Sequence, residues 1–180
     1  MRKIILLLCC LPLLACSRNP EADDTKSVSA ESASTQSTNT GPVLSWDAYG
    51  ALHFGVTLAE AEKLVGKAEP MGPTEPACHY VRFASLPGAL FMVENSIITR
   101  ADVEPAVPNA TGIAVGGSFA DAKAKYPAAI VEPHKYVDGH YLILKNADGS
   151  MAVVMEETGG KITEIRAGLL PAARYVEGCS

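Results

Sequence analysis

Few residues of this chain have the type and spacing that catalysis or metal binding requires. His134 and His140, with Glu132 nearby, could in principle hold a metal, but their spacing matches no helical or zinc-binding pattern. Ser118 follows two glycines, as a nucleophile would, but the sequence lacks the full Gly-x-Ser-x-Gly elbow, and a helix cap explains this serine better.

Two further motifs also fall short of a functional site. Residues 146–149, Asn-Ala-Asp-Gly, resemble a fragment of a calcium-binding loop without its remaining ligands, and a hairpin turn explains them better. The chain has no glycine-rich phosphate loop and no dinucleotide-binding fingerprint. We therefore predict a protein that is not an enzyme, with no catalytic residue, no metal site and no cofactor.

The first residues have the pattern of an export signal. Arg2 and Lys3 precede an apolar run from 4 to 14, which is too short for a permanent membrane-spanning helix. The run ends in Leu-Leu-Ala followed by Cys16, which resembles the lipobox of bacterial lipoproteins. The resemblance implies that residues 1–15 are a lipoprotein signal peptide and that Cys16 carries the lipid. The alternatives are an ordinary signal peptide or an uncleaved anchor.

The lipid anchor also implies a location. Two or more acyl chains give a stable attachment to the membrane without spanning it. By resemblance to enterobacterial sorting, the non-acidic Ser17 favours the outer membrane of a Gram-negative bacterium. Residues 16–42 are rich in Ser, Thr, Ala and Glu and predict a disordered tether, which would reach roughly 25–30 Å.

Charge argues against nucleic acid as a partner. Loss of Arg2 and Lys3 with the signal leaves 13 of the 15 basic residues against 20 acidic residues. Binding of phosphate backbones needs clustered lysine and arginine, so we predict no nucleic-acid binding.

Cysteine usage predicts one disulfide. Cys9 and Cys10 lie in the signal peptide and Cys16 is assigned to the lipid, which leaves Cys78 and Cys179. An even pair in an oxidising compartment is typical of a disulfide. A free buried thiol or a metal ligand remains the alternative for these two residues.

The chain contains an internal repeat. Residues 55–61 (Gly-Val-Thr-Leu-Ala-Glu-Ala) and 116–122 (Gly-Gly-Ser-Phe-Ala-Asp-Ala) share the order glycine, hydroxyl residue, acid and alanine. The same spacing of 61 residues relates 79–83 to 140–144. Self-similarity at a fixed period indicates duplication of one supersecondary unit. We therefore predict a first repeat at 43–104 and a second repeat at 105–180.

Each repeat starts with a helix cap. Thr57 with Glu60, and Ser118 with Asp121, have the spacing of a capping box, in which the hydroxyl and the acid satisfy free backbone N–H groups. The spacing predicts helices over 58–65 and 119–126.

The rest of each repeat is predicted to be loop and strand. Residues 67–77 predict a loop because they contain three prolines. We also predict a short entry strand at 52–54, ahead of the first helix. Turn residues and β-patterned runs predict further strands near 78–84, 89–94, 97–103, 129–133, 140–145, 151–157 and 161–167.

The order of these elements predicts an α+β fold. It consists of two tandem repeats of a short helix plus antiparallel strands, with the helices packed on one face of a sheet and the other face open. Alternation along the strands places Val81, Phe83, Leu142 and Leu144 toward the helices. The candidate partner-binding residues on the open face are Tyr80, Arg82, Arg100, Tyr141, Lys145 and Arg166.

The Gly-x-Thr-x-x-Glu-Ala start at Gly55–Ala61, followed by a helix and antiparallel strands, resembles the small SmpA/OmlA outer-membrane lipoproteins. The tandem arrangement is similar to the β-lactamase inhibitory protein fold. The resemblance covers roughly residues 50–170 and implies a non-enzymatic envelope protein that binds another envelope protein. The alternatives are an inhibitor of an envelope hydrolase, of the β-lactamase or lysozyme type, and a glycan-binding module.

Overall fold

The computed structural model describes residues 41–179, and their regular secondary structure is mainly antiparallel β-structure. The signal peptide, Cys16 and almost all of the tether lie outside the described residues. Within the described residues, neither helix has the length and apolar character needed to cross a bilayer.

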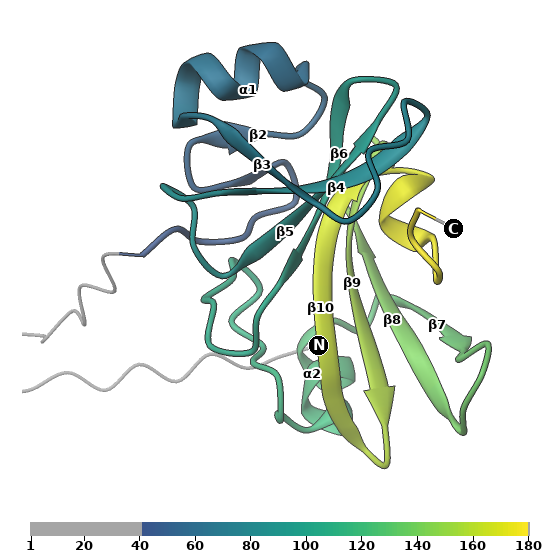
Figure 1. Cartoon of the computed structure of the whole chain (residues 1–180). Helices are drawn as coiled ribbons and strands as arrows, with labels where there is room; N and C mark the ends of the chain where they lie inside the picture. Colours follow the sequence, from purple (N-terminus) through teal and green to yellow (C-terminus); the bar gives the residue numbers. More distant parts are fainter. Residues whose placement is uncertain (1–40, 180) are drawn as a thin grey trace, which may run out of the picture. The chain divides into compact units, whose positions relative to one another are not determined.

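The main sheet has eight strands in the order β3-β4-β5-β6-β10-β9-β8-β7. Its first half comprises β3 (Ala68–Met71), β4 (Cys78–Phe83), β5 (Ala89–Glu94) and β6 (Ile97–Val103). Its second half comprises β7 (Ile130–Pro133), β8 (Gly139–Lys145), β9 (Met151–Thr158) and β10 (Lys161–Leu169). In both halves each strand pairs with the next strand along the chain, and the halves meet where β6 pairs with β10 (Figure 1).

The smaller elements precede each half or follow the last strand. The hairpin of β1 (Ala48–Tyr49) and β2 (Leu52–His53) leads into α1 (Leu58–Val65). Helix α2 (Phe119–Lys125) precedes β7, and the short 3₁₀ helix η1 (Ala172–Arg174) follows β10.

The predicted α+β fold with a helical layer on the sheet is wrong, because the chain is mostly β. The two α-helices have only eight and seven residues. Gly66 ends α1 with a positive φ of 97°, and α2 stops before Pro127. The α-helices contribute only Ala61, Phe119 and Ala122 to the buried core, so most of what packs on the sheet is not helical.

Strands β1 and β3 were not predicted from the sequence, whereas β2 lies within the entry strand expected at 52–54. Residues 68–71 contain Pro70 and lie in the segment that the sequence analysis assigned to a loop. β3 is an edge strand, where a missing N–H is tolerated, so proline does not prevent pairing with β4.

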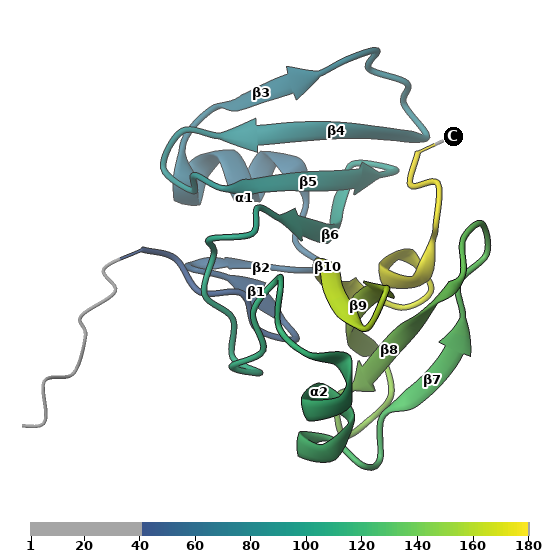
Figure 2. The ribbon, with the colours of Figure 1, turned by 90° about the horizontal axis from the view of Figure 1, so that it is seen from below.

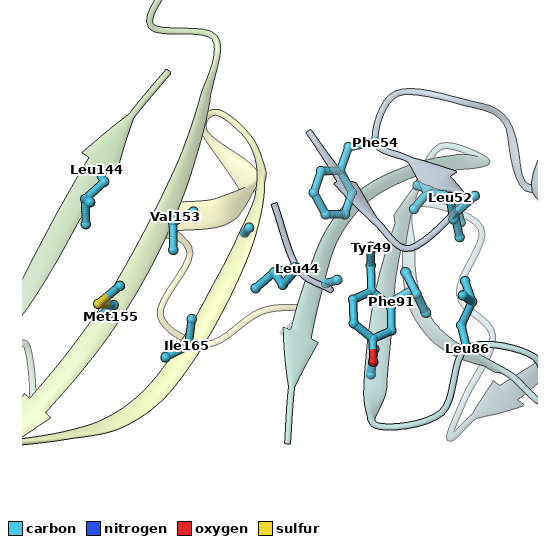
Figure 3. Packing of buried hydrophobic residues seen from close by; sticks show 14 of the residues in the cluster. Leu44, Tyr49, Leu52, Phe54, Leu86, Phe91, Leu144, Val153, Met155 and Ile165 are labelled. Atoms are coloured by element: carbon cyan, nitrogen blue, oxygen red, sulfur yellow. The ribbon is translucent and has the colours of Figure 1, made fainter. Parts of the chain in front are cut away.

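The other strand predictions agree with the structure to within a few residues, and so does the assignment of side chains to faces. Val81, Phe83, Leu142 and Leu144 are buried in one cluster, which also contains Leu44, Tyr49, Leu52 and Phe54 from the N-terminal segment. Figure 3 shows Leu44 between side chains of the two halves of the sheet. The N-terminal hairpin region therefore takes the covering role that the sequence analysis gave to the helices.

The two halves make equivalent hydrogen bonds at their starts. The N–H of Gly55 donates to the carbonyl of Ile98 at 2.8 Å, and the N–H of Gly116 donates to that of Ile162 at 2.7 Å. Single β-bridges join Thr57 to Ile97 and Ser118 to Lys161. These contacts fix each glycine and its helix cap against the last strand of the same half.

The predicted capping box is complete at Thr57, whereas at Ser118 only the serine half of the second predicted box is present. Thr57 and Glu60 form a complete capping box, with backbone-to-side-chain hydrogen bonds of 3.2 and 2.9 Å. Ser118 accepts from the N–H of Asp121 at 3.3 Å. Each cap satisfies at least one backbone donor that the first helical turn cannot pair internally.

Candidate protein-binding surface

Three of the predicted binding residues are buried, so the expectation that they lie on an open face is wrong. Arg100, Tyr141 and Arg166 are 5%, 6% and 2% exposed. The segment from 170 to 179, which includes η1, covers them. Figure 2 shows this segment on the other side of β8 and β9 from α2. The sheet face opposite the main core is therefore closed over these residues by the chain itself.

Arg100 holds the covering segment through its backbone. Its guanidinium donates to the carbonyl of Ala172 at 3.2 Å and to that of Tyr175 at 2.7 Å. The same side chain forms an ion pair with Asp102 at 2.8 Å and contacts the hydroxyl of Tyr80 at 3.4 Å. Because these acceptors lie within the protein, the buried arginine stabilises the fold and is not free to contact an external partner.

Tyr80 lies beneath the end of the same segment. Burial raises the pKa of its hydroxyl, although the positive charge of Arg100 acts in the opposite direction. A Cβ atom added to Gly178 would lie 2.1 Å from the Tyr80 hydroxyl oxygen, so only glycine allows the backbone to pass this close. The predicted disulfide between Cys78 and Cys179 is present and links the end of the segment to the start of β4.

Arg166 forms a second buried network. Its Nε donates to the carbonyl of Ala173 at 2.9 Å, and its Nη1 pairs with Glu156. Burial acts to raise the pKa of Glu156, but the hydrogen bonds and positive charge of Arg166 and the contact with His134 outweigh it, so the pKa is lowered. Glu156 is therefore held as a carboxylate between two nitrogen donors.

The remaining two predicted binding residues are accessible. Arg82 forms an ion pair with Glu104 at 3.3 Å, and both side chains are about half exposed. Lys145 is exposed at the end of β8. The structure thus separates the predicted set into buried residues beneath the C-terminal segment and two accessible cations elsewhere.

His134 organises the turn between β7 and β8. Its Nε2 lies 3.1 Å from Glu156, and its Nδ1 accepts from the N–H groups of Tyr136 at 3.1 Å and Val137 at 3.3 Å. Because Nδ1 accepts two hydrogen bonds, the proton of the neutral ring belongs on Nε2, where it points at the carboxylate. The ring of Tyr141 stacks on His134 with centroids 4.6 Å apart.

The turn that His134 fixes presents apolar side chains to solvent. Tyr136 is 61% and Val137 is 49% exposed. The C-terminal segment contacts the same turn, because Lys135 pairs with Glu177 at 2.6 Å. Tyr175 on the C-terminal segment is 37% exposed. We name Tyr136, Val137 and Tyr175 the hairpin surface.

The hairpin surface was not predicted from the sequence. His134 was expected only as a possible metal ligand, whereas it hydrogen-bonds to one carboxylate, and His140 contacts another, Glu157, at 2.8 Å. No group of three potential metal-ligating side chains occurs in the part of the chain that the structure describes. The available signal was Tyr136-Val137, an apolar pair within a polar turn, because an exposed apolar run outside the core is unusual without a function.

Comparison with known proteins adds no functional assignment: no family model, curated protein or solved structure matches this chain. The resemblance to SmpA/OmlA lipoproteins stays a prediction from the sequence.

Proposed function

We propose that this protein is a lipid-anchored, non-enzymatic protein of the bacterial cell envelope that binds another protein through the hairpin surface. The observation that carries the proposal is the fixed turn at the end of β7, where Tyr136 and Val137 are exposed while their backbone N–H groups are bonded to the partly buried ring of His134. Cys16 would hold the anchor, and the tether would separate the folded part from the lipid.

Two physical arguments support this choice of surface. Tyrosine is among the residues that dominate binding energies at protein interfaces. A turn that is already ordered loses little conformational freedom on binding, so more of the contact energy appears as affinity. The hydrogen bonds of His134 and the ion pair of Lys135 with Glu177 order this turn before any partner arrives.

The experiment is site-specific photo-crosslinking in cells. A photoreactive amino acid replaces Tyr136 in the full-length chain, and the matched control places it at Leu64 on α1, which is 60% exposed against 61% for Tyr136. We expect a discrete protein adduct from position 136 and none of that mass from position 64. Equal adducts from both positions, or none from either, would contradict the proposed surface.

An inhibitor of an envelope hydrolase is the second candidate, because a rigid, projecting turn with a tyrosine could enter an enzyme cleft. Figure 1 shows the β7–β8 turn at an extremity of the sheet. Purified protein in micromolar excess would then slow a β-lactamase or a lysozyme, and Tyr136→Ala would abolish the effect. Unchanged rates with both enzymes would eliminate this candidate.

A further inference from the structure

A hollow next to Trp46 lies outside the hairpin surface. It has a volume of about 330 Å³. It is bordered by the segment before β1, by the end of α2 with the residues that follow, and by the end of β8. The lining residues are Trp46, Lys125, Tyr126, Pro127, Leu144 and Lys145, with two alanines, Ala128 and Ala129. This size is at the lower end of the range found for small-molecule sites.

The aromatic walls of the hollow are fixed by hydrogen bonds to the backbone. The indole N–H of Trp46 donates to the carbonyl of Leu144 at 3.0 Å. The hydroxyl of Tyr126 donates to the carbonyl of Thr111 at 2.8 Å. Both rings therefore have their polar atoms satisfied within the protein, and a ligand would meet preformed apolar faces.

The ionisable residues that line the hollow are positive, whereas the net charge of the whole chain is negative. The chain has 20 acidic and 15 basic residues, yet the lining includes two lysines and no carboxylate. Neither Lys125 nor Lys145 forms an ion pair with a described residue, whereas the arginines at 82, 100, 166 and 174 all do. Two unpaired cations beside apolar walls favour an anion over a neutral or cationic ligand.

We propose that this hollow binds a small free carboxylate with an aromatic or aliphatic body. The body packs against Trp46, Tyr126 and Leu144, and the carboxylate lies between the ammonium groups of Lys125 and Lys145. The site is separate from the hairpin surface, so it does not depend on the proposed protein-binding function.

The protein contains its own reporter for this site, because Trp46 is its only tryptophan. The probes are 4-phenylbutyrate, its neutral analogue 4-phenyl-1-butanol and its cationic analogue 4-phenylbutylamine, titrated into the purified full-length chain. We expect a saturable change in Trp46 fluorescence with an apparent Kd for the carboxylate at least about twofold lower than for the alcohol, because two exposed ion pairs add modestly to the affinity. We expect the amine to bind more weakly than the alcohol.

Matched variants separate this site from general charge effects. Lys125→Gln with Lys145→Gln should remove the preference for the carboxylate over the alcohol. Lys63→Gln with Lys67→Gln, which changes the net charge equally at a distant site, should preserve it. Ala128→Phe, at an exposed lining position, should weaken binding of both probes while the circular dichroism spectrum stays unchanged.

Three outcomes would overturn the proposal. The first is the absence of a saturable change in fluorescence with the carboxylate. The second is equal affinity for the carboxylate and the alcohol in the unaltered protein. The third is an equal loss of preference in the Lys63/Lys67 control.

Discussion

The guanidinium of Arg100 on β6 donates a 2.7 Å hydrogen bond to the main-chain carbonyl of Tyr175, 75 residues later in the chain. This contact joins the centre of the sheet to the segment that closes over it. Because the contact uses backbone acceptors, the side chains of Ala172 and Tyr175 are not needed for it.

Replacing Arg100 should therefore destabilise the protein strongly. Arg100→Ala leaves Asp102 and the carbonyls of Ala172 and Tyr175 without their donor in a buried region. We expect a loss of about 3–5 kcal/mol in the free energy of unfolding, measured by urea denaturation. Arg82→Ala is the control, because its partly exposed pair with Glu104 should contribute less than about 1 kcal/mol. Equal losses in the two variants would contradict the structural role of Arg100.

The disulfide should stabilise the covering segment. Cys78 and Cys179 close a loop of 101 residues, so the double variant Cys78→Ala with Cys179→Ala should lose about 2–5 kcal/mol of unfolding free energy. The unaltered protein should lose a similar amount in dithiothreitol, whereas the double variant should not respond to the reductant. A response of the double variant would show that another group is being reduced.

Glu156 should make stability depend on acid pH. Its pKa in the folded protein lies below its ordinary value of 4.5, so it contributes stability that is fully present above that value and is lost as the pH falls through the folded pKa. Glu156→Gln leaves Arg166 buried without its carboxylate, and we expect a loss of about 3 kcal/mol at pH 7.

The test compares unfolding free energies of the unaltered protein and this variant from pH 7 to pH 3. The difference between them should begin to shrink below about pH 4.5 and should be smallest below the folded pKa of Glu156, where both proteins lack the charge. Glu69→Gln, at an exposed position of β3, should differ little from the unaltered protein throughout. A difference for Glu156→Gln that stays constant with pH would contradict the assignment.

His134 should control the order of the turn that carries Tyr136. His134→Ala removes the acceptor of the Tyr136 and Val137 N–H groups, so the hydrogen exchange of each amide should become about fivefold faster, in line with about 1 kcal/mol per lost hydrogen bond. His53→Ala changes an exposed histidine and should leave these two amides unaffected. Unchanged exchange in His134→Ala, followed by NMR, would show that other contacts hold the turn.

Lipid attachment is tested by labelling. We expect cells fed radiolabelled palmitate to incorporate it into the protein, and Cys16→Ser to abolish both the label and recovery in the membrane fraction. Cys78→Ser, which changes another cysteine, should keep the label. Label retained in Cys16→Ser would place the lipid elsewhere or eliminate the lipoprotein assignment.

Local signals in the sequence predicted most strands, the two α-helices, the caps and the disulfide, because turn residues, alternation and capping spacing act over a few residues. The fold class was wrong because the sequence does not show that the segment around Leu44 and Tyr49 packs where helices were expected. The closed sheet face was missed for a similar reason, since residues 170–179 have no strong periodic pattern.

The lack of a sequence signal for segments that cover the sheet also explains the errors in the candidate site. Alternation placed Tyr141 and Arg166 on the correct side of the sheet, but it carries no information about whether another segment covers that side. The polarity of arginine suggested exposure, whereas backbone carbonyls and carboxylates accept hydrogen bonds from the buried guanidinium groups of Arg100 and Arg166. Tyr136 was missed because a turn residue has no strand or helix periodicity to mark it.

The strand order has a consequence for how the chain folds. Every adjacent pair in the sheet is consecutive along the sequence except β6 and β10, where Arg100 lies opposite Gly168. A Cβ atom on Gly168 would lie 2.2 Å from the carbonyl oxygen of Thr99, so this seam tolerates no side chain there. Closing a longer loop costs more conformational entropy, so we expect the four strands of each half to pair first, through their own hairpins. The pairing of β6 with β10 joins residues far apart in the sequence, and we expect it to be the slow step of folding.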